Sequence, residues 1–147
     1  DWGLAVHAAP GEEWKQIDPV NYERLSEPWR RRVFDYVARL VRCRTTAGAL
    51  AVNDTRFLHA DFTEGKRVVV WQRGRDDDPV VVVANFSDYG TPPPASPDRP
   101  AEYQVPNWPA TPPGKQWREV TQARDVPAEW AGREPIYPWE AKVYILT

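Results

Sequence analysis

Residues 79–88 read PVVVVANFSD, so four consecutive valines and an alanine are followed abruptly by Asn, Phe, Ser and Asp. Successive side chains of a β-strand point to opposite faces of its sheet, and an all-valine strand is therefore apolar on both faces. Such a strand is typical of the centre of a sheet. The pattern predicts a buried central strand in PVVVVANF that leaves the core where NFSD begins.

Other short segments have strand-like patterns. TRFLHADF (55–62) and RVVVWQR (67–73) precede the valine run. The polar loop GRDDDP (74–79) predicts an antiparallel hairpin between RVVVWQR and the valine run. Further strand candidates are EYQVP (102–106), QWREVTQ (116–122) and PWEAKVYILT (138–147). The segment RDVPAEWAGREP (124–135) between them is expected to be a loop, or at most one helical turn.

One segment has helical periodicity instead. In SEPWRRRVFDYVARLVRCR (26–44) the apolar side chains recur at three- and four-residue spacing and form one stripe, made of Trp29, Val33, Tyr36, Val37, Leu40 and Val41. Ser26 is the expected N-cap, and Asp35 is expected to pair with Arg31 and Arg39 on the opposite face. Thr45, Thr46 and Gly48 are expected to end the helix.

One long helix followed by six or seven short antiparallel strands predicts a mainly β fold. The spacing of strands and turns favours an antiparallel β-sandwich or Greek-key domain over residues 51–147. Residues 1–50 are expected to form a separate part, consisting of an irregular segment and the helix.

Composition narrows the range of functions. The chain has 147 residues, a net charge of −2, a single cysteine and no methionine, and it starts at Asp1. The charge favours neither a nucleic-acid nor a membrane partner, and one cysteine excludes an internal disulfide framework. No apolar run approaches the roughly 20 residues of a membrane span. We expect the chain to be a piece of a longer protein, from the bacterial cytoplasm or secreted.

The order of several motifs resembles the C-terminal region of the α-amylase family of glycoside hydrolases. In that family the last helix of the (β/α)₈ barrel commonly ends in a Leu-x-x-x-Arg pattern, an Ala-Leu link follows, a hairpin strand ends in Asn-Phe-Ser, and a Pro-x-Glu-Ala phrase introduces the closing strand. The matching residues here are Leu40 and Arg44, Ala49 and Leu50, Asn85 to Ser87, and Pro138 to Ala141. The resemblance covers about residues 26–147, and the proline-rich stretches at 91–100 and 106–113 depart from the family pattern.

The resemblance implies a non-catalytic C-terminal β-domain. The resemblance further implies that this domain supports a barrel that cleaves or transfers α-glucosidic bonds, as in starch, and that only the last helix of that barrel belongs to this chain. The family's catalytic carboxylates lie in barrel motifs that are absent from this sequence, so we expect no catalytic residue here and no enzyme activity of the fragment alone. Its expected partner is the catalytic barrel of the parent chain.

A second hypothesis is a carbohydrate-binding module. Trp108 (PNWP) and Trp130 (AEWAG) lie in predicted loops, where an exposed indole can stack on a sugar ring; the alternative is that both rings anchor their loops by packing. Trp71, Trp117 and Trp139 lie on strand patterns and are expected in the core. A third hypothesis is an unrelated sandwich used for protein interaction.

Other polar residues carry weaker signals. Asp76, Asp77 and Asp78 have the oxygen ligands that Ca²⁺ prefers, but their spacing is that of a solvated hairpin tip. His7 and His59 lack neighbouring ligands at metal-site spacing, so no metal or cofactor is expected. Cys43 lies between Arg42 and Arg44, which could lower its thiol pKa, although no base accompanies it.

The helix stripe leads to a further expectation. Without a barrel, Trp29, Val33, Val37 and Leu40 lack part of their partner surface. Either residues 1–25 fold over them, or the chain self-associates through them.

Overall fold

The computed structural model describes residues 22–94, 96 and 100–147. Two units are distinguished, Asp1–Asp35 and Tyr36–Thr147, and each is described by itself. The boundary falls inside the helix, so the second unit holds the last part of the helix together with all the strands. A division at residue 50 stays a prediction, and His7 lies outside the described residues.

The predicted helix is confirmed as α1 (Pro28–Thr46), which follows the 3₁₀ helix η1 (Tyr22–Ser26). The predicted N-cap is wrong, because Ser26 belongs to η1 and the carbonyl of Glu27 accepts the first helical bond, from the backbone N–H of Arg31. The predicted Arg31–Asp35 ion pair is present at 3.0 Å.

The apolar stripe of α1 is largely open to solvent. Trp29 is 54% exposed, Val33 55% and Val37 50%, whereas Leu40 is half-buried. Most of the segment suggested as a cover, residues 1–21, lies outside the described residues, so that alternative and self-association stay predictions.

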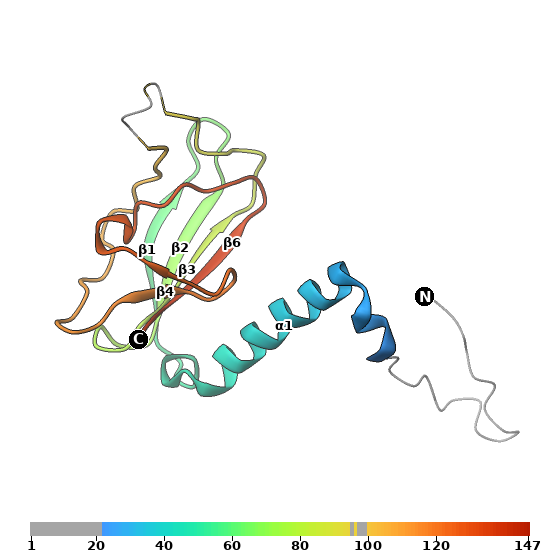
Figure 1. Cartoon of the computed structure of the whole chain (residues 1–147). Coiled ribbons are helices and arrows are strands. Elements are labelled where there is room, and N and C mark those ends of the chain that lie inside the picture. Colours follow the sequence, from blue (N-terminus) through green and yellow to red (C-terminus); the bar gives the residue numbers. More distant parts are fainter. Residues whose placement is uncertain (1–21, 95, 97–99) are drawn as a thin grey trace, which may run out of the picture. The chain divides into compact units, whose positions relative to one another are not determined.

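The six strands described form one antiparallel sheet in the order β1-β2-β3-β6-β4-β5. Figure 1 shows β1, β2, β3 and β6 side by side. Their bounds are β1 Thr55–Asp61, β2 Val68–Arg73, β3 Val80–Asn85, β4 Trp117–Glu119, β5 Arg124–Val126 and β6 Ala141–Leu146. The mainly β class with a preceding helix is confirmed; the sandwich or Greek-key arrangement stays a prediction.

The valine run is the central strand that its composition predicts, because β3 pairs with β2 on one side and β6 on the other. Val81 is fully buried and Val83 is 4% exposed. The strand ends at Asn85, whose side-chain amide donates to the carbonyls of Tyr89 (2.6 Å) and Tyr137 (2.8 Å). The abrupt change after the valines therefore marks a buried polar anchor for two loops.

Loops cover one face of the sheet, which we call the inner face. Its side chains join buried loop residues in one core: Leu58, Val68, Val70, Val81, Val83, Tyr103, Val105, Trp117, Val126, Ile136, Tyr144 and Leu146. The predicted strand at 102–106 is wrong. Tyr103 and Val105 alternate with exposed neighbours as in a strand, but the segment has no strand partner. Pro106 has no N–H for a ladder, and the Val105 N–H bonds instead to the carbonyl of Gly132 at 2.8 Å.

Two elements lie in the segment predicted as a loop with at most one helical turn. The turn is η3 (Ala128–Trp130), and β5 is a three-residue strand that the pattern missed. β5 exists because its neighbour β4 provides a pairing edge, with Val126 opposite Trp117. Three residues are too few for a periodic signal in the sequence.

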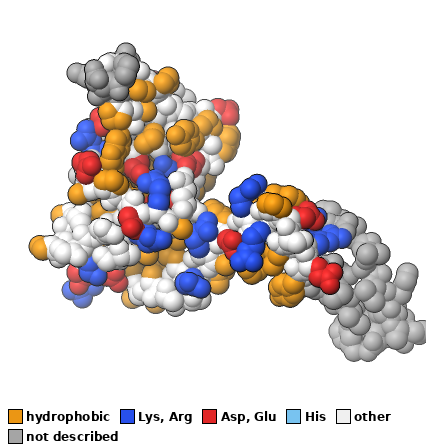
Figure 2. Space-filling view, in the orientation of Figure 1, with side chains coloured by type: hydrophobic (Ala, Val, Ile, Leu, Met, Phe, Trp, Pro, Cys, Tyr) orange, Lys and Arg blue, Asp and Glu red, His pale blue; other side chains and the backbone are white. Residues whose placement is uncertain are grey.

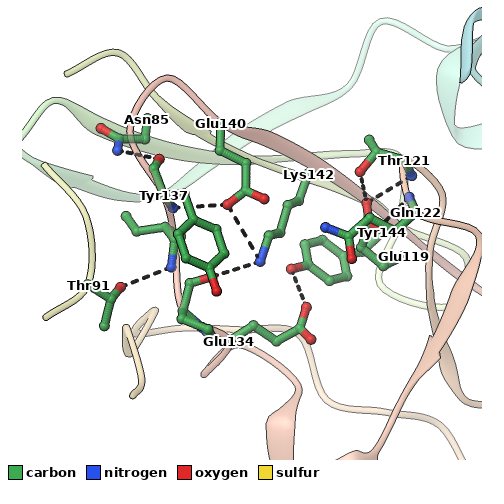
Figure 3. A network of polar contacts seen from close by, with 12 residues as sticks. Asn85, Thr91, Glu119, Thr121, Gln122, Glu134, Tyr137, Glu140, Lys142 and Tyr144 are labelled. Atoms are coloured by element: carbon green, nitrogen blue, oxygen red, sulfur yellow. Dashed lines mark hydrogen bonds and ion pairs between the residues drawn. The ribbon is translucent and has the colours of Figure 1, made fainter. Parts of the chain in front are cut away.

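A buried polar network fixes the end of the sheet formed by β4 and β6 (Figure 3). Glu119 is fully buried, and its carboxylate accepts from the backbone N–H groups of Thr121 (2.8 Å) and Gln122 (2.7 Å). Glu134 accepts from the Tyr144 hydroxyl at 2.7 Å and pairs with Arg124 at 2.6 Å. Burial alone would raise the pKa of Glu134, but these partners lower it on balance.

Arg39 joins α1 to this end of the sheet. It does not pair with Asp35 as predicted; its guanidinium donates to the carbonyls of Val120 (3.2 Å) and Thr121 (2.7 Å). Bonds from a charged donor are stronger than neutral ones, so Arg39→Ala is expected to lower the free energy of unfolding by about 2 kcal/mol in urea titrations. The control Arg31→Ala removes an exposed ion pair and a distant contact with the Phe34 ring (6.0 Å), and should cost about 0.5 kcal/mol or less. Equal effects of the two variants would contradict the assignment.

Candidate functional site

The two tryptophans considered as candidates for sugar stacking, Trp108 and Trp130, both pack against the core. Trp108 is half-buried, and its ring lies edge-to-face with Trp117 (5.3 Å between centroids) and Tyr144 (5.1 Å). Its indole N–H is buried without a hydrogen-bond partner among the described residues. Trp130 ends η3 and is also half-buried against the core. Both rings anchor their loops, and sugar binding by either one stays a prediction.

An open groove of about 730 Å³ runs past Trp108. The groove is lined by Phe57, which is 71% exposed, by Pro109, Pro112 and Pro113, and by the polar residues Arg56, Asp76 and Asn107. Arg56 pairs with Asp76 at 2.7 Å, and the buried Gln72 bonds to both side chains at 2.9 Å. The groove therefore combines one exposed aromatic ring with a prepositioned polar pair.

The three aspartates of the β2–β3 loop do not gather around a common point for a metal. Asp76 faces Arg56 and Gln72. The hydrogen bond from Gln72, followed by the charge of Arg56, lowers the pKa of the Asp76 carboxyl. Asp77 approaches Arg75 at 3.9 Å. Among residues 22–94, 96 and 100–147, no cluster of three or more His, Cys, Asp or Glu side chains is arranged to hold a metal ion.

His59 belongs to a hydrogen-bonded chain that the sequence did not indicate. Its Nε2 lies 2.9 Å from the Tyr103 hydroxyl, which donates to Asp61 at 3.1 Å, and Lys66 approaches Asp61 at 3.4 Å. Burial, followed by the Asp61 charge, raises the pKa of Tyr103, so its hydroxyl stays protonated. This series of hydrogen bonds ties β1 to the segment around Tyr103, which is a structural role.

Asp61 makes the stability of this region dependent on pH. The Thr63 hydroxyl (2.7 Å) and backbone N–H (3.0 Å) donate to Asp61 and hold the pKa of its carboxyl well below the ordinary value, with Tyr103 and Lys66 adding to the effect. The folded pKa is lowered, so the stabilisation is complete above the unfolded value of about 3.9 and is lost progressively as the pH falls from there through the folded value. Asp61→Asn should lower the urea midpoint at neutral pH, and this deficit should shrink steadily as the pH is lowered below about 4. The control Asp77→Asn should follow wild type throughout; an Asp61→Asn deficit independent of pH would contradict the linkage.

Cys43 is a buried thiol on α1, and burial raises its pKa. The sequence-based suggestion that Arg42 and Arg44 lower this pKa is wrong, because desolvation of the thiolate outweighs them and the Arg44 guanidinium is directed to the carbonyl of Leu50 at 2.6 Å. Cys43 is therefore not activated as a nucleophile.

The sheet face opposite the core, which we call the outer face, is apolar and incompletely covered. Its centre is made of Val69, Trp71, Val82, Ala84, Ala141 and Val143, which are neighbours in register across β2, β3 and β6. The four larger side chains are half-buried, Ala84 is buried and Ala141 is exposed. Figure 2 shows hydrophobic side chains gathered over parts of the surface of the unit that holds the sheet, Tyr36–Thr147. No charged side chain interrupts this central patch.

Trp139 is not in the core, contrary to the prediction for Trp71, Trp117 and Trp139. Trp117 is 1% exposed and confirms the prediction, Trp71 is half-buried, and Trp139 is 66% exposed. The reason is that β6 begins only at Ala141, so Trp139 lies in the preceding turn and outside the alternation of the strand. Phe86 and Tyr137, which flank the same end of the sheet, are 57% and 56% exposed.

Comparisons with known proteins add no family. No protein-family model matches the chain, and no curated protein matches it. Among the described residues, no helix is both long and apolar enough to span a membrane.

Proposed function

We propose that the chain is a non-catalytic C-terminal β-domain of an α-amylase-like glycoside hydrolase. In this proposal its outer face and the stripe of α1 lie against the catalytic barrel of the parent protein, which cleaves or transfers α-glucosidic bonds. The ordered motifs described above support the family, and the exposed apolar surfaces support the docking role. The domain itself supplies no catalytic carboxylate.

The observation that carries the proposal is the outer face. A sheet whose two faces are both apolar along its central strands is typical of a layer covered on both sides. Loops cover the inner face here, whereas the larger side chains at the centre of the outer face are only half-buried. Covering the outer face would stabilise the protein by about 25 cal/mol per Å² of apolar surface removed from water. A layer added there would also complete the sandwich-like packing that the strand pattern favours.

The coding sequence upstream of the Asp1 codon provides the first test. We expect it to encode a barrel with a catalytic Glu at a strand end and a later His-Asp pair, and the complete product should act on α-glucosides. Val82→Lys, at the centre of the outer face, should lower the unfolding temperature of the complete protein more than that of the isolated chain. Gln104→Lys, at an exposed loop position, is the matched control. An upstream sequence without a barrel would refute the proposal.

A second candidate function is carbohydrate binding in the groove beside Trp108. The exposed ring of Phe57 next to the fixed Arg56–Asp76 pair favours it, since sugar sites combine an aromatic face with planar polar groups. Titration with maltooligosaccharides, followed by tryptophan fluorescence, tests it: a response that Phe57→Ala and Asp76→Ala abolish supports binding. No response at millimolar sugar rejects it.

A further inference from the structure

Trp139 combines two features that are unfavourable in an isolated domain. Its backbone has φ = +56°, a left-handed conformation that bulky residues rarely adopt. Its side chain is 66% exposed, so no burial of the ring compensates for the strain. Strained residues of this kind persist where the surrounding structure imposes them, and they are often found at binding sites.

Hydrogen bonds around Trp139 hold the turn in this conformation. The Trp139 N–H donates to the Ser87 carbonyl (3.1 Å), and the Tyr137 N–H donates to the Glu140 carboxylate (3.0 Å). Asn85, itself 2% exposed, donates to the Tyr137 carbonyl (Figure 3). The turn is thus tied to the buried end of β3, and it has little freedom to relax.

The indole is also fixed in orientation. Its Nε1–H donates to Asp88 Oδ1 at 2.8 Å, which satisfies the one polar group of the ring while leaving the ring exposed. A rigid aromatic side chain loses little conformational entropy on binding, and Trp and Tyr are enriched among the residues that dominate interface energies. The turn therefore presents a prepositioned anchor.

We infer that Trp139 is the anchor residue by which the domain docks on the catalytic barrel, and that its strained backbone is retained for this contact. The inference rests on the proposed function. Ala141, two residues later, belongs to the outer face and pairs with Ala84, so the turn that holds Trp139 leads directly into that face. The barrel surface it fits is apolar, with a recess for the indole and a basic side chain opposite the exposed Asp88.

A protein surface fits this site better than a sugar does. A sugar-binding site needs polar groups that converge on hydroxyls, whereas the only polar atom of the indole is already bonded to Asp88. The centre of the neighbouring outer face consists of aliphatic side chains and Trp71. Aromatic residues beside an uncharged patch are the composition of a protein-interface core.

Glycine and alanine at position 139 separate the ring from the strain. Both variants remove the indole, but only glycine adopts the left-handed conformation without strain. In the isolated chain, Trp139→Gly should therefore unfold about 3 °C above Trp139→Ala and no lower than wild type. In the complete protein, both variants should unfold several degrees below wild type, measured as α-glucosidase activity left after heating. Asp88→Ala, which frees the indole, should show a smaller loss of the same sign.

Several results would overturn the inference. If Trp139→Gly raises the unfolding temperature equally in the isolated chain and in a barrel-containing protein, the anchor role fails while the proposed function stands. A coding sequence without a barrel removes both. Maltotriose binding that Trp139→Gly abolishes would assign the ring to sugar instead. Concentration-dependent sedimentation of the isolated chain that Trp139→Gly abolishes would assign it to a second copy of the chain.

Discussion

Replacing Glu119 with alanine is expected to lower the free energy of unfolding by about 3–5 kcal/mol, the cost of breaking a buried charged network. The carboxylate is fully buried and accepts bonds from the backbone of Thr121 and Gln122 and from the Thr121 hydroxyl. Alanine would leave the buried backbone N–H and hydroxyl of Thr121 without their acceptor. Because the same turn offers its carbonyls to Arg39, the loss should also loosen α1 from the sheet.

Urea denaturation followed by circular dichroism measures this effect. The matched control is Glu102→Ala, which removes a carboxylate exposed on a loop and paired with Arg133 at 2.7 Å; it should cost about 0.5 kcal/mol. Glu119→Gln keeps one acceptor oxygen and is expected between the two. A Glu119→Ala variant within about 1 kcal/mol of wild type would show that the turn finds other partners.

The second large effect is expected at Gly132. Its φ is +73°, and a Cβ added there would lie 2.7–2.9 Å from the side chain of Trp108, closer than such atoms approach in proteins. Gly132→Ala should therefore cost about 3 kcal/mol, the sum of backbone strain and overpacking against a ring that the core holds in place.

Gly114 provides a control for the strain alone. Its φ is +77°, but a Cβ there meets no atom within 4 Å, so Gly114→Ala should cost only about 1 kcal/mol. In a Trp108→Ala background, the cost of Gly132→Ala should fall to the same value, because the clashing ring is gone. A double-mutant cycle with no coupling between positions 108 and 132 would contradict the packing described here.

These predictions concern contacts between residues far apart in the sequence, and sequence periodicity does not reveal such contacts. The pattern correctly placed α1, the β1–β3 segments and β6, since each is long enough to show a repeat of its own, and the strand predicted at 116–122 contains the shorter β4. It missed β5 and wrongly made 102–106 a strand. In both cases the deciding factor was whether a neighbouring strand edge was available, not the local order of apolar residues.

The tryptophans show the same limit at the level of the site. The loop position of Trp108 left exposure and packing both open, whereas the strand-like surroundings of Trp139 suggested burial. The structure shows Trp108 packed against the core and contradicts the burial of Trp139. The loop of Trp108 folds over the core, whereas Trp139 is held outside it by bonds to Ser87 and Asp88. A positive φ at a tryptophan has no signature in the sequence.

Sequence alone determined that this protein has a central valine strand apolar on both faces and a helix with one apolar stripe, because side-chain direction along a strand or helix follows directly from backbone geometry. Only the tertiary structure decided which of the two sheet faces the loops cover and which aromatic rings stay in solvent. That choice depends on long-range packing and on hydrogen bonds such as those of Asn85 and Glu119, which join segments that the local pattern treats as independent.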